Sequence, residues 1–149
     1  PKSQWGTKEW PFFYELAINF FSKFRIAWIG VDRIPEGVPG DVLGEKLPWD
    51  QLLNLFSNCK GVVCNDSSPL HFATAFNKPS LSFWGPTSLN FGYGPYGNSK
   101  SVVIETNNLR CRPCSIHGPQ KCPLQHHQCM RSLTVINVSS KVEQWKKYL

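Results

Sequence analysis

The sequence predicts an α/β fold of the Rossmann-like type, with a parallel sheet and helices on both of its faces. Short apolar segments typical of buried strands alternate along the chain with segments of helical periodicity, and this alternation builds βαβ units with right-handed crossovers. The chain has 149 residues, of which 41% are hydrophobic and 17% are charged. It is therefore large enough for a sizeable core, and we expect residues 1–149 to form one domain.

The first predicted helix opens at Trp10-Pro11, because proline suits the first position of a helix. Residues 24–30 (FRIAWIG) are predicted to form a buried strand, and the Pro- and Gly-rich residues 33–40 a loop. Apolar residues recur at helical spacing in the first helix and give it one broad apolar face: Phe12, Phe13, Leu16, Ala17, Phe20 and Phe21.

Beyond this loop, apolar runs of strand length again alternate with helical patterns. Helices are predicted over residues 49–56, 69–76 and 138–149, and strands over residues 61–64, 79–84 and 101–105. Parallel strands of one sheet end at the same edge, and ligands bind outside that edge.

Two polar turns follow directly after predicted buried strands. Residues 65–68 (NDSS) follow one strand, and residues 85–87 (GPT) follow the next. Both should line one crevice. A helix starts at Pro69, and its free N–H groups and dipole favour an anion there. The alternative is an ordinary helix cap, with Asp66 or Ser67 as the capping residue, and the two roles can coexist.

The net charge of +6 fits either a generic basic surface or a polyanionic partner. No run of five basic residues occurs, so nucleic acid is not the expected partner, and a nucleotide diphosphate or an anionic lipid suits the charge better. The longest apolar stretches are too short to span a bilayer. No basic-then-apolar leader opens the chain, so we predict no signal peptide in it.

Four cysteines form a compact cluster with the pattern Cys111-x2-Cys114-x7-Cys122-x6-Cys129. This spacing predicts a small Cys-rich insertion over residues 111–129, a knuckle that holds a structural zinc or iron ion. Two disulfides or four free thiols are the alternatives. The remaining two cysteines, Cys59 and Cys64, are predicted to be core residues.

Three blocks of the sequence resemble the C-terminal domain of the glycosyltransferase family 9 heptosyltransferases. The first block, PKSQWGTKEWP (residues 1–11), is similar to the family's phosphate loop, which ends in Lys-x-Trp-Pro. The second, NDSSPLHFATAFNKPSLSFWGPTS (residues 65–88), resembles its Asn-Asp-Ser-Gly block with a following His, Lys-Pro and Gly-Pro-Thr. The third, residues 111–138, resembles the Cys-bearing tail of many members. The blocks occur in the family's order across nearly the whole chain.

The resemblance implies the C-terminal half of a two-domain GT-B enzyme. It implies an ADP-heptose donor bound by this chain, no organic cofactor, and a lipid-linked saccharide or protein acceptor. The first strand and the acceptor domain, with its general base, would then lie outside this sequence, and the isolated chain would be inactive. The implied location is the cytoplasm, with peripheral contact to the inner membrane of a Gram-negative bacterium.

The resemblance also implies catalytic roles for three residues. Lys8 corresponds to a lysine that binds the diphosphate, and a compact ammonium charge suits that role. Asp66 corresponds to an aspartate that contacts the sugar. His71 corresponds to a histidine that points toward the sugar or the phosphate.

Further residues are implied to bind the donor. The hydroxyls of Ser3 and Thr7 lie in the phosphate loop, and Ser67 and Ser68 would donate to the diphosphate, although the family usually has glycine in place of Ser68. Two other positions complete the implied set: Leu47 against the adenine, near backbone contacts from residues 46–49, and Thr87 near the floor of the cleft.

Two points stay open at this stage. Asp32 and Glu36 are alternative partners for the ribose hydroxyls, and the sequence does not choose between them. A non-catalytic binding or assembly module, whose Cys knuckle docks a partner, is the alternative to an enzyme.

Overall fold

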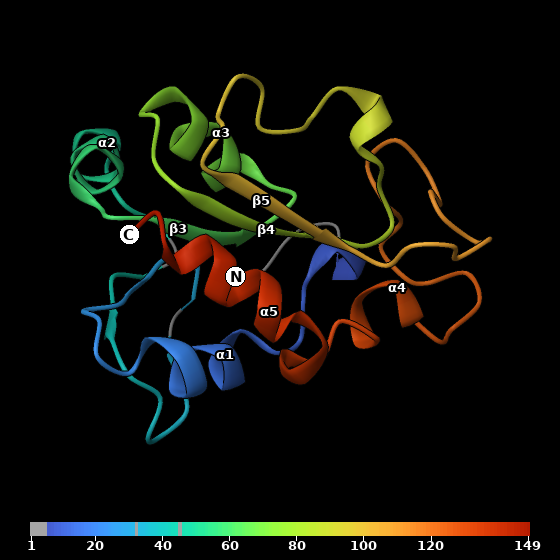
Figure 1. The fold of residues 1–149 in the computed structure, drawn as a ribbon, viewed down its shortest axis with the longest axis horizontal. Helices are drawn as coiled ribbons and strands as arrows, with labels where there is room; N and C mark the ends of the chain where they lie inside the picture. The colour runs from blue at the N-terminus through green and yellow to red at the C-terminus, as the bar shows by residue number, and fades with distance from the viewer. Residues whose placement is uncertain (1–5, 32, 45) are drawn as a thin grey trace.

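A computed structural model of the chain describes residues 6–31, 33–44 and 46–149. Its main sheet is parallel, has the strand order β3-β4-β5, and is made of β3 (Val62–Asn65), β4 (Ser80–Trp84) and β5 (Ser101–Glu105). A second, two-stranded parallel sheet pairs β1 (Ala27–Trp28) with β2 (Asp41–Val42). Figure 1 shows how the two sheets and the helices are arranged.

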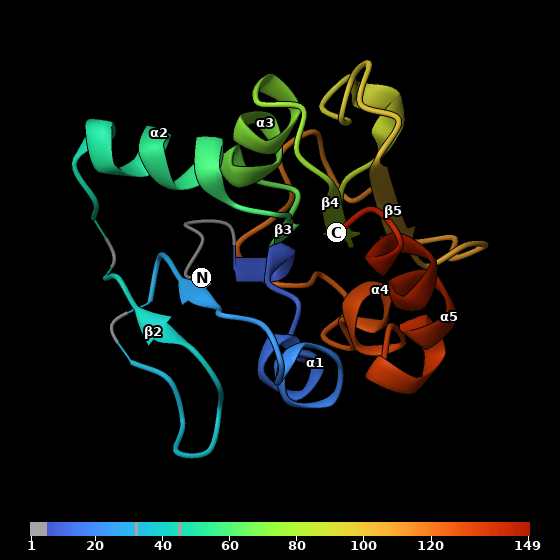
Figure 2. The same ribbon diagram turned by 60° about the vertical axis from the view of Figure 1, so that its left-hand side comes forward.

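Helices cover both faces of the main sheet. On one face lie α2 (Trp49–Asn58) and α3 (Ser68–Ala75), and on the other α1 (Phe13–Phe21) and α5 (Val135–Lys146) (Figure 2). Three short helices complete the described chain: the 3-10 helices η1 (Gly6–Lys8) and η2 (Leu89–Phe91), and α4 (Gln128–Arg131). Within the described ranges, no helix combines the length and the apolar character that a membrane crossing requires.

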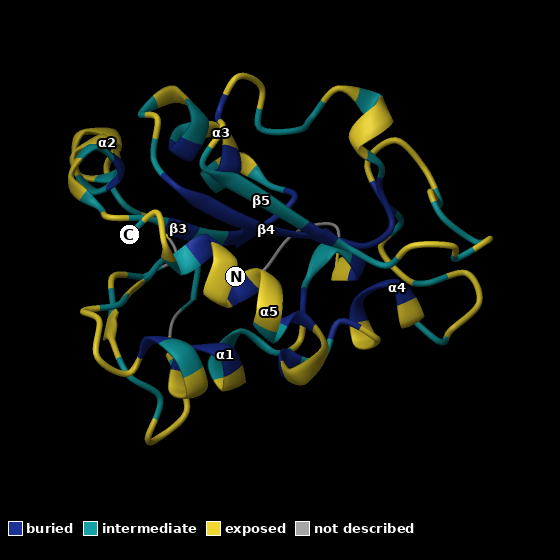
Figure 3. Ribbon diagram, viewed as in Figure 1, coloured by how far each residue is buried: buried dark blue, intermediate teal, exposed yellow. Residues whose placement is uncertain are grey.

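The central strand β4 is buried on both faces, as its dark blue ribbon in Figure 3 shows. Its side chains alternate between two cores, as the twofold period of a strand requires. Leu81 and Phe83 belong to the core on the side of α1 and α5, whereas Trp84 belongs to the core under α2 and α3. Both layers of helices are thereby anchored on one strand.

The structure confirms the predicted α/β class and most of its elements. The predicted strand over residues 24–30 is a partial error, because only Ala27–Trp28 is extended and it pairs with β2 instead of the main sheet. The partner strand β2 was not predicted. The Trp28 indole N–H donates to the Pro39 carbonyl at 2.9 Å and folds the loop back onto the strand.

Three differences lie in the second half of the chain. The last helix begins at Val135 instead of residue 138, because the Thr134 hydroxyl accepts the Asn137 N–H at 3.3 Å and caps an earlier turn. The short helices α4 and η2 were not predicted. Both are too brief to give a periodic apolar pattern.

Trp10 joins the first segment of the chain to the sheet and to α5. Its ring stacks on Phe83 of β4 with centroids 3.7 Å apart and an angle of 8° between the planes. Its indole N–H donates to the Leu133 carbonyl at 2.8 Å, and its backbone N–H donates to Asn65 Oδ1 at 3.0 Å. Trp10 is 2% exposed, so both hydrogen bonds lie in a dry interior where an unpaired partner would be costly.

We expect Trp10→Ala to lower the free energy of unfolding by about 3–5 kcal/mol, the usual cost of deleting a large buried aromatic side chain. Urea unfolding measures this. Tyr96→Ala is the matched control, since Tyr96 is 93% exposed and its loss should change stability by less than about 0.5 kcal/mol. Equal midpoints for the two variants would show that the stacked contact does not hold the first segment in place.

Candidate active site

A buried group of three polar side chains lies at the carboxyl edge of the main sheet. The Lys8 ammonium is 2.6 Å from Asp66 Oδ2 and donates to the Asp66 carbonyl at 3.2 Å. The Thr87 hydroxyl donates to the same Asp66 Oδ2 at 2.8 Å. Asp66 is only 3% exposed and Thr87 is fully buried. The carboxylate is therefore held by an ion pair and a hydrogen bond with little water around it.

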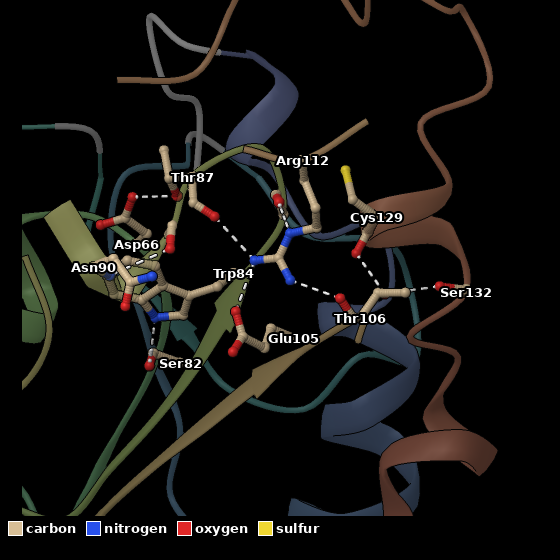
Figure 4. A network of polar contacts seen from close by, with 12 residues as sticks. Asp66, Ser82, Trp84, Thr87, Asn90, Glu105, Thr106, Arg112, Cys129 and Ser132 are labelled. Carbon is tan, nitrogen blue, oxygen red and sulfur yellow. Dashed lines mark hydrogen bonds and ion pairs between the residues drawn. The ribbon is translucent and has the colours of Figure 1, made fainter. Parts of the chain in front are cut away.

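The sheet itself brings Asp66 and Thr87 together. β3 and β4 are parallel and in register, with Asn65 opposite Phe83, so both strands end at the same level. The Asp66 N–H still donates to the Phe83 carbonyl at 3.2 Å. This confirms the expectation that the two polar turns line one edge. Figure 4 shows Asp66 beside Thr87 at the end of β4.

The start of α3 carries no side-chain cap. Ser67 occupies the N-cap position in an extended conformation, but its side chain makes no capping hydrogen bond. Its hydroxyl donates instead to the Asn65 carbonyl at 3.3 Å, while the Asp66 carboxylate turns to Lys8 and Thr87. The interpretation of Asp66 or Ser67 as an ordinary cap is therefore wrong. In the first turn of α3, Pro69 has no N–H and the Leu70 N–H donates to the Ser67 carbonyl at 3.0 Å, so this helix end offers an anion the Ser68 N–H and the helix dipole.

The other predicted donor-binding residues are less closely joined to this group. Ser68 and His71 lie at the start of α3 with exposed side chains, and in the described part of the chain no contact links His71 to Lys8 or Asp66. Leu47 is half-buried just before α2. Ser3 and one of the two ribose candidates, Asp32, lie outside the described residues. The other candidate, Glu36, is exposed in a turn.

The side chain of Thr7 is used inside the fold and is not presented to a ligand. The residue is 4% exposed and its hydroxyl donates to the Pro119 carbonyl. A hydroxyl carries one proton, so in this arrangement Thr7 cannot also donate to a phosphate. The Thr7 carbonyl lies 2.8 Å from Nε2 of His127. The expected role of the Thr7 side chain as a ligand donor is therefore not supported by its geometry.

The Cys-rich segment, residues 111–129, contacts the residue before Lys8 and the residue before Thr87. Pro119 and His127 contact Thr7, next to Lys8, and the Cys114 N–H donates to the Pro86 carbonyl at 2.7 Å. Gly118 has φ of +79°, and a Cβ there would lie 2.9 Å from Pro86 Cγ. Glycine is thus required by both conformation and space. The segment is an irregular loop leading into α4, and the predicted compact knuckle is not evident in it.

Arg112 is a structural residue that the sequence did not reveal. Its guanidinium donates to the Gly85, Thr106 and Thr87 carbonyls at 2.7, 2.6 and 2.9 Å, and pairs with Glu105 at 2.7 Å (Figure 4). The side chain is 10% exposed. It therefore fixes the turn that carries Thr87. No local pattern distinguishes such a buried arginine from a surface one.

The thiols of the Cys-rich segment are unpaired. All six cysteines are free in the structure. Burial first, and then the negative charges of Cys114 and Cys122, raise the pKa of the Cys129 thiol to about 11. The pKa of Cys114 is raised by burial and by Cys111 and Cys122. Yet among the described residues no three Cys, His, Asp or Glu side chains converge closely enough to hold a metal ion.

Comparison with known proteins relates the chain to a family. The model of "Glycosyltransferase family 9 (heptosyltransferase)" matches residues 30–122, more than half of the chain. A lipooligosaccharide heptosyltransferase 2 of Campylobacter jejuni serotype O:2 is 25% identical over 165 residues, which cover 100% of this chain and 49% of the relative. The corresponding protein of serotype O:6 is 24% identical over 96% of this chain and 49% of its own length. The chain thus spans about half the length of these curated relatives.

A solved structure is similar as well. The structure of E. coli ADP-heptose lps heptosyltransferase II superposes with a TM-score of 0.67 and 22% identity over 94% of this chain and 42% of that one. At this identity the likeness establishes the fold, a Rossmann-like parallel sheet with helices as in a GT-B protein. Together with the family match, it leads to one conclusion: the chain belongs to glycosyltransferase family 9, the heptosyltransferase family.

Proposed function

We propose that this chain supplies the nucleotide-sugar site of a glycosyltransferase that transfers heptose from ADP-heptose to a lipopolysaccharide core or a related acceptor. The single observation that carries the proposal is the buried Lys8–Asp66–Thr87 group beside the uncapped start of α3. The family membership and the names of the relatives support the sugar and the acceptor. The proposed location is the cytoplasmic side of the inner membrane, with acceptor binding by a second domain.

The charges at this edge suit a leaving diphosphate. Transfer of a sugar from a nucleotide diphosphate places negative charge on the leaving group, and donors fixed beforehand at that point stabilise the transition state. The Lys8 ammonium has three N–H groups and directs contacts to two oxygens of Asp66. It therefore retains a donor, and α3 adds the Ser68 N–H and its dipole within two residues of Asp66.

Asp66 is better suited to the sugar than to the phosphates. An ionised carboxylate only accepts hydrogen bonds, and beside a diphosphate it would be repelled. The hydroxyls of a heptose are suitable donors to it. We propose that Asp66 orients the sugar while Lys8 and α3 hold the diphosphate, so that one ion pair links the two halves of the donor.

We further propose that Cys111, Cys114, Cys122 and Cys129 hold a structural zinc or iron ion. Four thiolates are a donor set that suits either metal. Two contacts support the proposal: Cys111 Sγ lies 4.0 Å from His126 Nε2, and the Cys114 thiol donates to the Cys111 carbonyl at 3.3 Å. An ion there would draw residues 111–129 together, and these residues carry the contacts to Thr7 and Pro86.

The nucleotide site is tested with the complete gene product that contains this chain. Lys8→Ala alone is ambiguous, because it leaves the buried Asp66 carboxylate without its cation, and such a loss destabilises the fold. We therefore compare Asp66→Asn with the double variant that also carries Lys8→Ala. Asp66→Asn should bind ADP nearly as the wild type does and should transfer heptose more slowly. Adding Lys8→Ala should then weaken ADP binding by roughly 10- to 150-fold, the range for a hydrogen bond to a charged group.

Calorimetry with ADP and a coupled transfer assay measure the two effects, and Lys141→Ala, an exposed lysine on α5, is the charge control. Equal ADP affinity of the double and single variants would remove Lys8 from the site. Wild-type turnover by Asp66→Asn would remove Asp66 from the sugar.

The metal is tested by elemental analysis of protein purified without added metal. We expect about one equivalent of zinc or iron per chain, and its loss in the Cys111→Ser, Cys114→Ser double variant. Cys59→Ser is the control, since Cys59 lies outside the cluster. Four titratable thiols in the segment with no bound metal would rule out the metal, and blocked thiols with no metal would indicate disulfides.

Because His127 contacts the backbone of Thr7, we expect His127→Phe to weaken ADP binding without removing a ligand contact. A loss of several-fold is expected, within the range for one intramolecular hydrogen bond of about 0.5–1.5 kcal/mol. The comparison variant is His71→Phe, a histidine of the predicted site on α3, which should change turnover more than ADP affinity. Unchanged affinity in His127→Phe would show that residues 111–129 do not position the loop of Lys8.

A further inference from the structure

An open cavity of about 560 Å³ adjoins the Lys8–Asp66–Thr87 group. It lies beyond the carboxyl ends of β4 and β5, between the loop that follows Thr87 and the segment that follows Glu105. In an open parallel sheet this is the edge at which ligands bind. Lys8, Asp66 and the start of α3 do not line this cavity, so its role needs a separate account.

The walls of the cavity suit a molecule rich in hydroxyl groups. Its side chains include three amides, Asn90, Asn107 and Asn108, and the hydroxyl-bearing Ser88, whereas the Thr106 hydroxyl donates to the Cys129 carbonyl at 3.0 Å. An amide both donates and accepts, so it can pair with the neighbouring hydroxyls of a sugar ring. Among the described lining residues there is no aromatic side chain, and a nucleobase would lack the stacking surface that commonly holds it.

The charge of the cavity is positive. The carboxylate of Glu105 is paired with Arg112 at 2.7 Å, and the remaining guanidinium contacts of Arg112 go to three backbone carbonyls. This pair is therefore neutral and shapes the wall. Arg110 also lines the cavity and is exposed. Among the described residues no carboxylate forms an ion pair with Arg110, so its charge favours an anionic group, such as a phosphate or a carboxylate on a sugar.

Thr87 lies between this cavity and the proposed donor site and contacts residues of both. Its hydroxyl donates to Asp66 on one side, and its carbonyl accepts from Arg112, a lining residue, on the other (Figure 4). A saccharide seated in the cavity would therefore lie beside the carboxylate that we assign to the donor sugar. This is the neighbourhood that an acceptor must reach for transfer to occur.

We propose that the cavity is a subsite for an anionic sugar unit of the acceptor saccharide. Asn107 and Asn108 would pair with its hydroxyls, and Arg110 with its phosphate or carboxylate. This inference rests on the proposed function, since it deepens the acceptor side of the same site. It assigns to this chain a share of acceptor recognition, in addition to donor binding.

The test is a binding experiment, so it does not depend on turnover. The probe is lipid-free, phosphorylated lipopolysaccharide core saccharide, titrated calorimetrically into the complete gene product saturated with ADP. Arg110→Ala and the double variant Asn107→Ala, Asn108→Ala should each bind the saccharide roughly tenfold more weakly, as expected for lost hydrogen bonds that include a charged partner. Their ADP affinity should match the wild type. Arg25→Ala, an exposed arginine beside β1, is the control and should change neither.

A second arm identifies the anion. If the anion is a phosphate, saccharide treated with a phosphatase should bind the wild type about as weakly as the untreated saccharide binds Arg110→Ala, whereas unchanged binding of the treated saccharide identifies the carboxylate as the anion. Wild-type saccharide affinity in both cavity variants, or a wild type that binds no core saccharide, would overturn the subsite. Failure of the wild type to bind ADP concerns the proposed function, and the saccharide titration repeated without ADP would still decide the cavity.

Discussion

The burial of one carboxylate is the constraint on which the rest of the site depends. Asp66 is 3% exposed, and an ionised group removed from water is strongly destabilising unless it is paired and hydrogen-bonded. Its two partners come from distant parts of the chain: Lys8 precedes α1, and Thr87 follows β4. The ion pair can form only when η1, β3 and β4 are all in place. It therefore couples the assembly of the sheet edge to the position of the residue that we assign to the diphosphate.

The residues that satisfy Asp66 are themselves held by the Cys-rich segment. Arg112 fixes the carbonyl of Thr87, and residues 118–127 support the loop of Lys8. This segment has little regular structure and no apolar periodicity, yet it contacts both sides of the buried group. A loop of this kind needs many specific polar contacts to be fixed, because it lacks the repeated backbone ladder of a helix or strand.

Strong local patterns made much of the fold predictable. β5 was predicted with its observed bounds, and α2 and β4 nearly so, because apolar runs and helical periodicity are read directly from neighbouring residues. The place of Asp66 and Thr87 at one edge followed from their positions directly after two predicted parallel strands. The pairing of Lys8 with Asp66, and the commitment of the Thr7 hydroxyl to Pro119, depend on contacts between residues 58 and 112 positions apart. The short β1–β2 pair was misjudged for a similar reason, since it is fixed by the return of a loop and carries only a weak local pattern.

The long separation between these partners has a consequence for how the molecule matures. His127 and Leu133 contact Thr7 and Trp10 across 120 and 123 positions, respectively. During synthesis the loop of Lys8 leaves the ribosome well before these partners, which emerge about 120 residues later. Native contacts of this range form late and leave apolar surface exposed meanwhile. The aromatic residues around Trp10 would then be the surface most in need of a chaperone, and the Lys8 loop would be among the last parts to reach its final form.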